Sequence, residues 1–126
     1  MPMEIIDAFD LPEWLGTSKV SWHSTTPLGA GPRVAGELEG SAGESQQLDL
    51  LAVDAAFPAP VCPDAERRAA HQAWQYGEVA LLDVDGTICA GVPGQHFDAN
   101  MAYEALRRLA KAVAADPGAF TVTLTL

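Results

Sequence analysis

The sequence predicts an α+β fold in which an antiparallel or mixed sheet of about five to six strands carries two helices packed on one face. An apolar segment that runs into the dipeptide Asp85-Gly86 is typical of a buried β-hairpin. Two segments, 64–76 and 98–113, repeat apolar residues at helical spacing, and the last segment, 120–126, alternates apolar residues with threonine. The expected element order is therefore β-β-β-α-β-β-α-β.

A chain of 126 residues is typical of one domain and buries enough surface to fold without disulfide bridges. We expect a single domain over residues 1–126, made of an acidic N-terminal arm (1–18) and an α+β core (19–126). In the arm, Pro12 restricts the residue before it to extended geometry, and Gly16 ends any helical turn.

The first part of the core predicts three strands. In residues 19–24, Val20 and Trp22 alternate with polar residues, which is the period of a half-buried strand. Residues 25–32 contain two prolines and two glycines, which favour a loop. Segments 33–39 and 47–55 are the next two strands, and the Gly- and Ser-containing residues between them predict a hairpin loop.

Both predicted helices have clear ends. The first follows a proline-rich extended stretch, places alanines and Trp74 along one stripe, and stops at Gly77. Asp98 is a good N-cap for the second, and Phe97 lies before it as a hydrophobic staple. The final strand places Phe120 and the apolar residues that follow at every second position on one face, with threonines on the other.

Composition excludes several classes of partner. The net charge of −10 and the isoelectric point near 4.4 oppose binding to nucleic acid or to an anionic membrane surface. No apolar window reaches the roughly 18 residues needed to span a bilayer, and the first ten residues lack a basic leader, so we expect a cytoplasmic protein. Cys62 and Cys89 lack metal-site spacing and are expected to be reduced. We therefore expect no cofactor and no metal.

The acidic charge is concentrated in residues 1–62, which contain nine acidic residues and two basic residues, Lys19 and Arg33. Tryptophan is enriched at binding hot spots, and an apolar anchor among acidic residues suits a basic protein surface. We therefore expect a partner-binding site at Trp14, Trp22, Glu37 and Glu39. The alternative for both tryptophans is packing within the protein's own core.

Residues 81–88, LLDVDGTI, resemble the first motif of the haloacid dehalogenase phosphatases. The resemblance implies that Asp83 is the nucleophile, that Asp85 is the acid/base, and that both help to bind Mg²⁺, for which carboxylate oxygens are suitable ligands. It covers only these eight positions, and the residues that follow offer one lysine, Lys111, and scattered acids. The same dipeptide, Asp85-Gly86, equally predicts a tight hairpin turn.

The leading hypothesis from the sequence is a small acidic cytoplasmic domain that binds a basic protein, as an inhibitor, immunity-type or accessory partner, without catalytic activity. One alternative is an Mg²⁺-dependent phosphotransferase with its site at Asp83 and Asp85. A further alternative is a homo-oligomeric protein with a small-ligand or structural role, in which the threonine face of residues 121–125 or a sheet edge meets a second copy.

Overall fold

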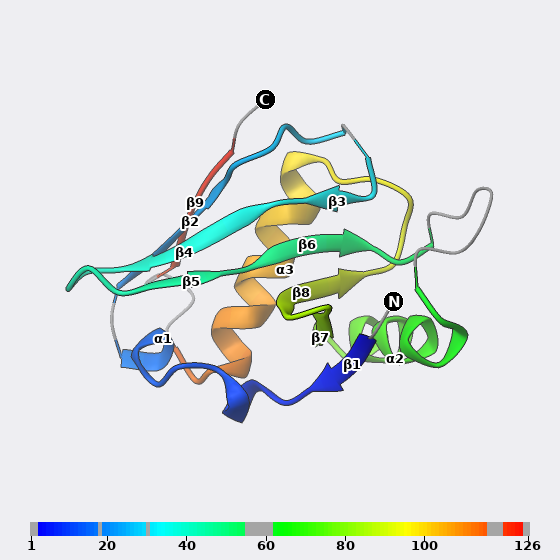
Figure 1. The fold of residues 1–126 in the computed structure, drawn as a ribbon, viewed down its shortest axis with the longest axis horizontal. Helices are drawn as coiled ribbons and strands as arrows, with labels where there is room; N and C mark the ends of the chain where they lie inside the picture. The colour runs from blue at the N-terminus through cyan, green and yellow to red at the C-terminus, as the bar shows by residue number, and fades with distance from the viewer. Residues whose placement is uncertain (1–2, 18, 30, 55–61, 116–119, 125–126) are drawn as a thin grey trace.

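The computed structural model describes residues 3–17, 19–29, 31–54, 62–115 and 120–124, and it confirms the α+β class. The described strands form two mixed sheets, a larger one in the order β1-β7-β8-β6-β3 and a smaller one in the order β5-β4-β2-β9 (Figure 1). The strands are β1 (Met3–Ile6), β2 (Val20–Ser24), β3 (Arg33–Val34), β4 (Gly36–Gly40), β5 (Ser45–Gln47), β6 (Asp49–Ala52), β7 (Ala80–Val84), β8 (Thr87–Val92) and β9 (Phe120–Thr123). The helices are α1 (Trp14–Thr17), α2 (Asp64–Gln75) and α3 (Ala99–Ala112), with a 3₁₀ turn, η1 (Ala8–Asp10), before α1.

One long hairpin belongs to both sheets. Its first arm is β3 followed by β4, and its second arm is β5 followed by β6. The pairing keeps one register from Arg33 opposite Leu51 to Glu39 opposite Ser45, so no residue is inserted where the hairpin passes from one sheet to the other. The predicted hairpin over 33–39 and 47–55 is therefore confirmed as far as Ala52, and its division between two sheets explains part of the larger strand count.

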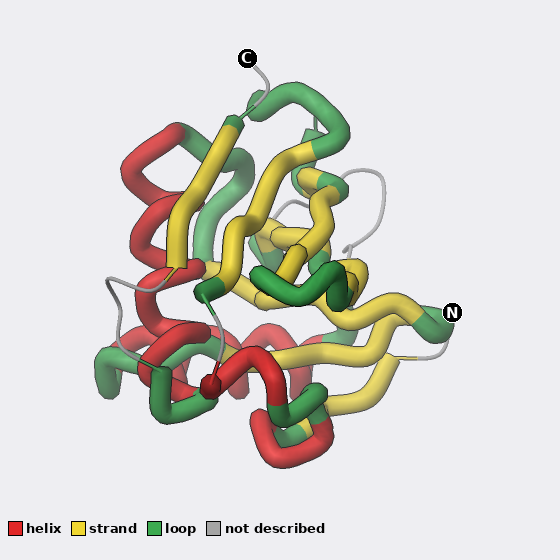
Figure 2. Tube along the Cα trace, turned by 90° about the vertical axis from the view of Figure 1, so that its left-hand side faces the viewer, coloured by secondary structure: helices red, strands yellow, loops and turns green. Residues whose placement is uncertain are grey.

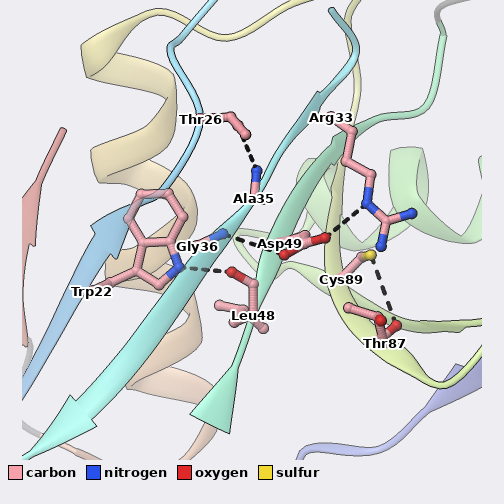
Figure 3. A network of polar contacts seen from close by, with 9 residues as sticks. All are labelled: Trp22, Thr26, Arg33, Ala35, Gly36, Leu48, Asp49, Thr87 and Cys89. Atoms are coloured by element: carbon pink, nitrogen blue, oxygen red, sulfur yellow. Dashed lines mark hydrogen bonds and ion pairs between the residues drawn. The ribbon is translucent and has the colours of Figure 1, made fainter. Parts of the chain in front are cut away.

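A buried polar network holds the long hairpin in place at the point where it crosses from one sheet to the other (Figure 3). The indole Nε1 of Trp22 donates to the Leu48 carbonyl at 2.8 Å, and the Asp49 carboxylate accepts from the Arg33 guanidinium at 2.7 Å and from the Gly36 amide at 3.3 Å. Both Trp22 and Asp49 are buried, with 0% and 2% of their surface exposed. These three contacts hold neighbouring positions on β2 and on both arms of the hairpin in fixed relation.

The two longer helices pack on opposite faces of the larger sheet. Leu81 of β7 packs in the core cluster that contains Leu106 and Leu109 of α3, whereas the next residue, Leu82, packs with Ala70 of α2. Adjacent strand residues point to opposite faces, so the prediction of both helices on one face is wrong. The apolar run of β7 is what a strand covered on both sides requires. The helix α3 also runs alongside β9 of the smaller sheet (Figure 2).

The predicted helix boundaries agree closely with the structure. The Asp98 side chain accepts a hydrogen bond from the Met101 amide at 2.7 Å, as expected for an N-cap, and α2 ends before Gly77, which has a φ of 80°. In β9, Phe120 is buried and Thr121 and Thr123 are exposed, which matches the predicted alternation, while residues 125 and 126 lie outside the described ranges. None of the helices in the described ranges is long and apolar enough to cross a membrane.

Candidate functional site

The N-terminal arm begins as an edge strand that the sequence analysis did not identify. Residues of β1 pair antiparallel with β7, from Met3 opposite Val84 to Ile6 opposite Leu81. The chain then turns through η1, where the Asp7 side chain accepts from the Phe9 amide at 3.0 Å and the Asp10 side chain accepts from the Asp7 amide at 3.3 Å. This reciprocal capping box holds the arm in a defined conformation after the strand ends.

The arm and the end of α2 expose large apolar side chains. Phe9 is 95% exposed, Ile5 54% and Tyr76 69%; among the described residues the other large exposed apolar residue is Tyr103, at 57%. Single exposed apolar residues are ordinary on protein surfaces, whereas a group of them marks an interaction site. Ile5 and Tyr76 line the same cleft, and Phe9 follows Ala8, which lines it as well.

This cleft has a volume of about 490 Å³ and lies between the arm and the C-terminal ends of α2 and α3. Small side chains create its depth, because Ala69 and Ala73 of α2 and Ala80 of β7 leave space that larger residues would fill. The alanine stripe of α2 therefore forms one wall of the cleft. A volume of this size accommodates one or two side chains of a partner.

Charged groups surround the apolar walls. Arg108 lies with its guanidinium 3.6 Å from the centroid of the Trp74 ring, and it donates to the carbonyls of Trp74 at 2.8 Å and Glu78 at 3.1 Å. The Arg108 guanidinium thereby binds backbone carbonyls at the C-terminal end of α2, where the helix dipole favours a cation. Asp7, Glu78 and Lys111 complete the charged lining, and within the described part of the chain none of these three side chains forms an ion pair.

The arm itself is strongly acidic. Glu4, Asp7, Asp10 and Glu13 are all exposed, and no basic residue in the described ranges lies within ion-pair distance of any of them. Glu4 is also directly opposite Asp83 in the pairing of β1 with β7. Two like charges opposite each other on neighbouring strands repel, so a basic group placed beside them gains favourable interactions with both.

The predicted partner-binding residues lie in different environments. Trp22 has no exposed surface and packs in the core, so the prediction of an exposed anchor at this position is wrong, and the core alternative applies. Trp14 is half-buried, and its ring lies against Gly40 near the tip of the long hairpin. Glu37 and Glu39 alternate with buried residues along β4 and lie on the outer face of the smaller sheet. The Glu39 carboxylate is 3.8 Å from the Nε2 of His23.

Comparisons of the chain with protein-family models, with curated proteins and with solved structures each find no match.

Asp83, near the end of β7, and Asp85 belong to a hairpin whose two turn residues are Asp85 and Gly86. Asp85 and Gly86 have φ angles of 53° and 91°, Val84 is opposite Thr87, and the Asp83 carboxylate accepts from the Gly86 amide at 2.8 Å. Strand β7 is antiparallel to both of its neighbours, whereas the phosphatase motif that residues 81–88 resemble ends a strand of a parallel sheet. Within the described ranges, no three His, Cys, Asp or Glu side chains are grouped to hold a metal ion.

The role of Asp83 in this turn leads to a prediction. We expect Asp83→Ala to lower the free energy of unfolding by about 1 kcal/mol, because the Gly86 amide loses its acceptor. Urea denaturation measures the change, with Asp83→Asn as the variant that keeps an acceptor oxygen. If both carboxylates instead form a magnesium site, millimolar Mg²⁺ will raise the melting temperature of the wild type, and Asp83→Asn will remove that increase.

Other reactive groups are held in structural contacts. His71 on α2 lies 2.8 Å from Asp54, whose burial alone would raise its pKa; the hydrogen bonds from His71 and from the Gly94 amide outweigh burial and lower the pKa of this carboxyl. Burial raises the pKa of Cys62 and of Cys89 to about 11. Because a thiolate is the nucleophilic form of cysteine, neither residue has the depressed pKa of a catalytic cysteine.

The cleft and the exposed residues beside it were not predicted from the sequence. The residues predicted to bind a partner were two tryptophans and two glutamates. One local signal was present, since Asp7 followed three residues later by Asp10 is the spacing of a capping box and predicts an ordered turn around Phe9. The contribution of Tyr76 could not be found in the same way, because it depends on how the end of α2 packs beside β1.

Proposed function

We propose that this protein binds a basic protein partner through the cleft and the acidic arm beside it. The observation that carries the proposal is the ordered turn η1, which presents Phe9 with 95% of its surface exposed among acidic side chains. An exposed aromatic ring on a fixed backbone loses little conformational entropy when a partner covers it. Aromatic anchors surrounded by charges of one sign are typical of specific interfaces with an oppositely charged partner.

The acidic residues of the smaller sheet support the same choice of partner. Glu37 and Glu39 lie on a face whose other exposed residues on β2, β5 and β9 are polar, and together with the arm they contribute to the net charge of −10. A field of one sign speeds the approach of an oppositely charged protein. We propose that these residues, with Trp14 at the hairpin tip, steer the partner or contact its periphery.

A role as an inhibitor or accessory subunit is consistent with this surface, because such proteins act by covering a site on their partner. The two cysteines of the described ranges are buried and unpaired, which suits a reducing compartment such as the cytoplasm. We therefore place the proposed complex in the cytoplasm.

The proposal predicts that Phe9→Ala weakens partner binding by about tenfold or more, because the ring would be the buried anchor of the complex. Stability should change by less than about 0.5 kcal/mol, since the side chain makes few contacts in the free protein. The partner is first captured from lysate of the native host with the tagged wild-type protein, identified by mass spectrometry, and titrated against purified variants by calorimetry.

Tyr103→Ala is the matched control, because it removes an aromatic side chain that is 57% exposed but lies on α3, outside the acidic arm. Equal affinities of wild type, Phe9→Ala and Tyr103→Ala for the captured partner would contradict the proposed surface. Capture of an acidic partner whose binding does not weaken with added salt would contradict the proposed charge complementarity.

A further inference from the structure

Within the described ranges, the outer edge of β1 has no paired strand, and it lies beside the cleft. In the larger sheet β1 is the last strand, and its described pairing is with β7 alone. Exposed strand edges are commonly protected by their shortness, by charged residues such as lysine, by proline, by a bulge or by a covering element; of these, β1 has its length of four residues and one charged residue, Glu4. The sequence of β1, Met-Glu-Ile-Ile, contains no lysine or proline, its register with β7 has no bulge, and Ile5 is 54% exposed.

Building on the proposed function, we propose that a segment of the basic partner binds by adding an antiparallel strand to the free edge of β1. The bound segment would extend the larger sheet by one strand and place its side chains in the cleft. Main-chain hydrogen bonds provide affinity in this mode of recognition, and the alternating side chains provide specificity.

The turn at Asp85-Gly86 fixes which backbone groups are free. A two-residue hairpin closes on a hydrogen-bonded pair, here Val84 with Thr87, so the backbone groups of Val84 point toward β8. The next residue, Asp83, then points its groups toward Glu4 on β1. Alternation along β1 directs the amide and carbonyl of Met3 and of Ile5 outward, to the free edge.

The two faces of β1 define the residues that an added strand needs. Ile5 lines the cleft and Met3 packs on the same side, against the core beneath α2. Glu4 is on the opposite face, next to Asp83. A bound strand would therefore alternate apolar residues, beside Ile5 and the cleft, with lysine or arginine beside the two carboxylates.

The same charges argue against a second copy of this chain as the occupant. Pairing β1 with β1 across a two-fold axis would bring Glu4 and Asp83 of one molecule close to the same residues of the other. Each molecule also carries a net charge of −10. Like charges at this distance are unfavourable, whereas a basic strand is attracted.

Peptides of defined spacing test the inference directly. A nine-residue peptide that alternates lysine and leucine, labelled with a fluorophore, is titrated against the wild-type protein and followed by anisotropy. A second peptide has the same composition at helical spacing. We expect the alternating peptide to bind at least about tenfold more tightly, because only it presents leucines on one face of a strand and lysines on the other.

N-methylation of the peptide backbone then tests whether the bound peptide forms strand hydrogen bonds with β1. In an antiparallel pair, residues opposite Ile5 direct their own amides toward β1, and these residues are the leucines. N-methylation of the leucines should therefore weaken binding by about tenfold for each hydrogen bond lost, whereas N-methylation of the lysines should leave it nearly unchanged. Equal effects of the two methylation patterns would overturn strand addition.

A pair of variants provides the matching test on the protein. Ile5→Pro removes the outward amide but no amide that pairs with β7, and Ile5→Ala removes most of the side chain while keeping that amide. We expect the proline variant to bind the alternating peptide about tenfold more weakly than the alanine variant. Circular dichroism and melting curves establish that both remain folded, and the methylated peptides keep the inference testable if the proline variant unfolds.

The outcomes separate this inference from the proposed function. If both peptides bind equally well and Phe9→Ala weakens them alike, strand addition is overturned while the basic partner surface is supported. If neither peptide binds at high micromolar concentration, strand addition is overturned, and the capture experiment with Phe9→Ala decides the proposed function independently. Light scattering that shows a dimer of the wild type and a monomer of Ile5→Pro, which lacks the outward amide, would assign the edge to a second copy instead and overturn the inference.

Discussion

Gly36→Ala is expected to lower the free energy of unfolding by about 3 kcal/mol, because a methyl group at this position would enter the Trp22 ring. A Cβ built on Gly36 lies 2.2 Å from the Cζ2 atom of Trp22, and the two next nearest atoms of the same ring are 2.4 and 2.6 Å away. The ring cannot move aside easily, because it is fully buried and its Nε1 is hydrogen-bonded to Leu48. Urea denaturation monitored by tryptophan fluorescence measures the loss.

Gly31→Ala is the control for this experiment. A Cβ on Gly31 meets no atom within 4 Å, and its backbone does not have the positive φ angle that disfavours alanine. Its free energy of unfolding should therefore change by less than about 1 kcal/mol. If the two alanine variants are equally stable, the contact between Gly36 and Trp22 does not constrain the fold in the way that the structure indicates.

Arg33→Ala is expected to cost about 2 to 3 kcal/mol, because it leaves the Asp49 carboxylate buried without its cation. The two side chains are 2.7 Å apart, with 3% of the aspartate side chain exposed and 38% of the arginine side chain. Removing one partner of a fully buried ion pair costs about 3 to 5 kcal/mol, and access of water through the vacated arginine position reduces this amount. Chemical denaturation at neutral pH gives the value.

The double variant Arg33→Ala/Asp49→Asn shows whether the cost arises from the unpaired charge. Asparagine keeps an oxygen that can accept from the Gly36 amide, and it leaves no charge to be compensated. We expect the double variant to recover about half of the stability lost by Arg33→Ala. A double variant no more stable than the single one would assign the loss to the missing arginine contacts rather than to the charge.

Local chemistry made much of the fold predictable. Asp98, Gly77 and the Asp85-Gly86 turn each act within a few residues of themselves, so their roles as N-cap, helix stop and hairpin turn could be predicted from the sequence. The placement of α2 and α3 on opposite faces could not be predicted in this way. Leu81 and Leu82 are both apolar, and such a pair indicates burial on both sides without showing which element covers each.

The candidate site was less predictable because exposure depends on tertiary structure. Trp22 and Phe9 both occur in short amphipathic segments, and the sequence favoured the larger ring as the surface anchor. In the structure Gly36 leaves space that the indole fills, so Trp22 belongs to the core, whereas Phe9 keeps 95% of its surface exposed. The acidic character of the arm was visible in the sequence, but its position beside a free strand edge and a cleft required the pairing of β1 with β7.

The unbroken hairpin that crosses from one sheet to the other makes cooperative unfolding the expected behaviour of the core. Each of its arms is a member of both sheets, so separating the strands at one end removes pairing that the other end shares. A state in which the smaller sheet has melted while the larger one stays intact would have to break the hairpin at Gly36 and Leu48, where Trp22 and Asp49 make their buried hydrogen bonds. The two sheets therefore form one folding unit, although they are separate in their strand order.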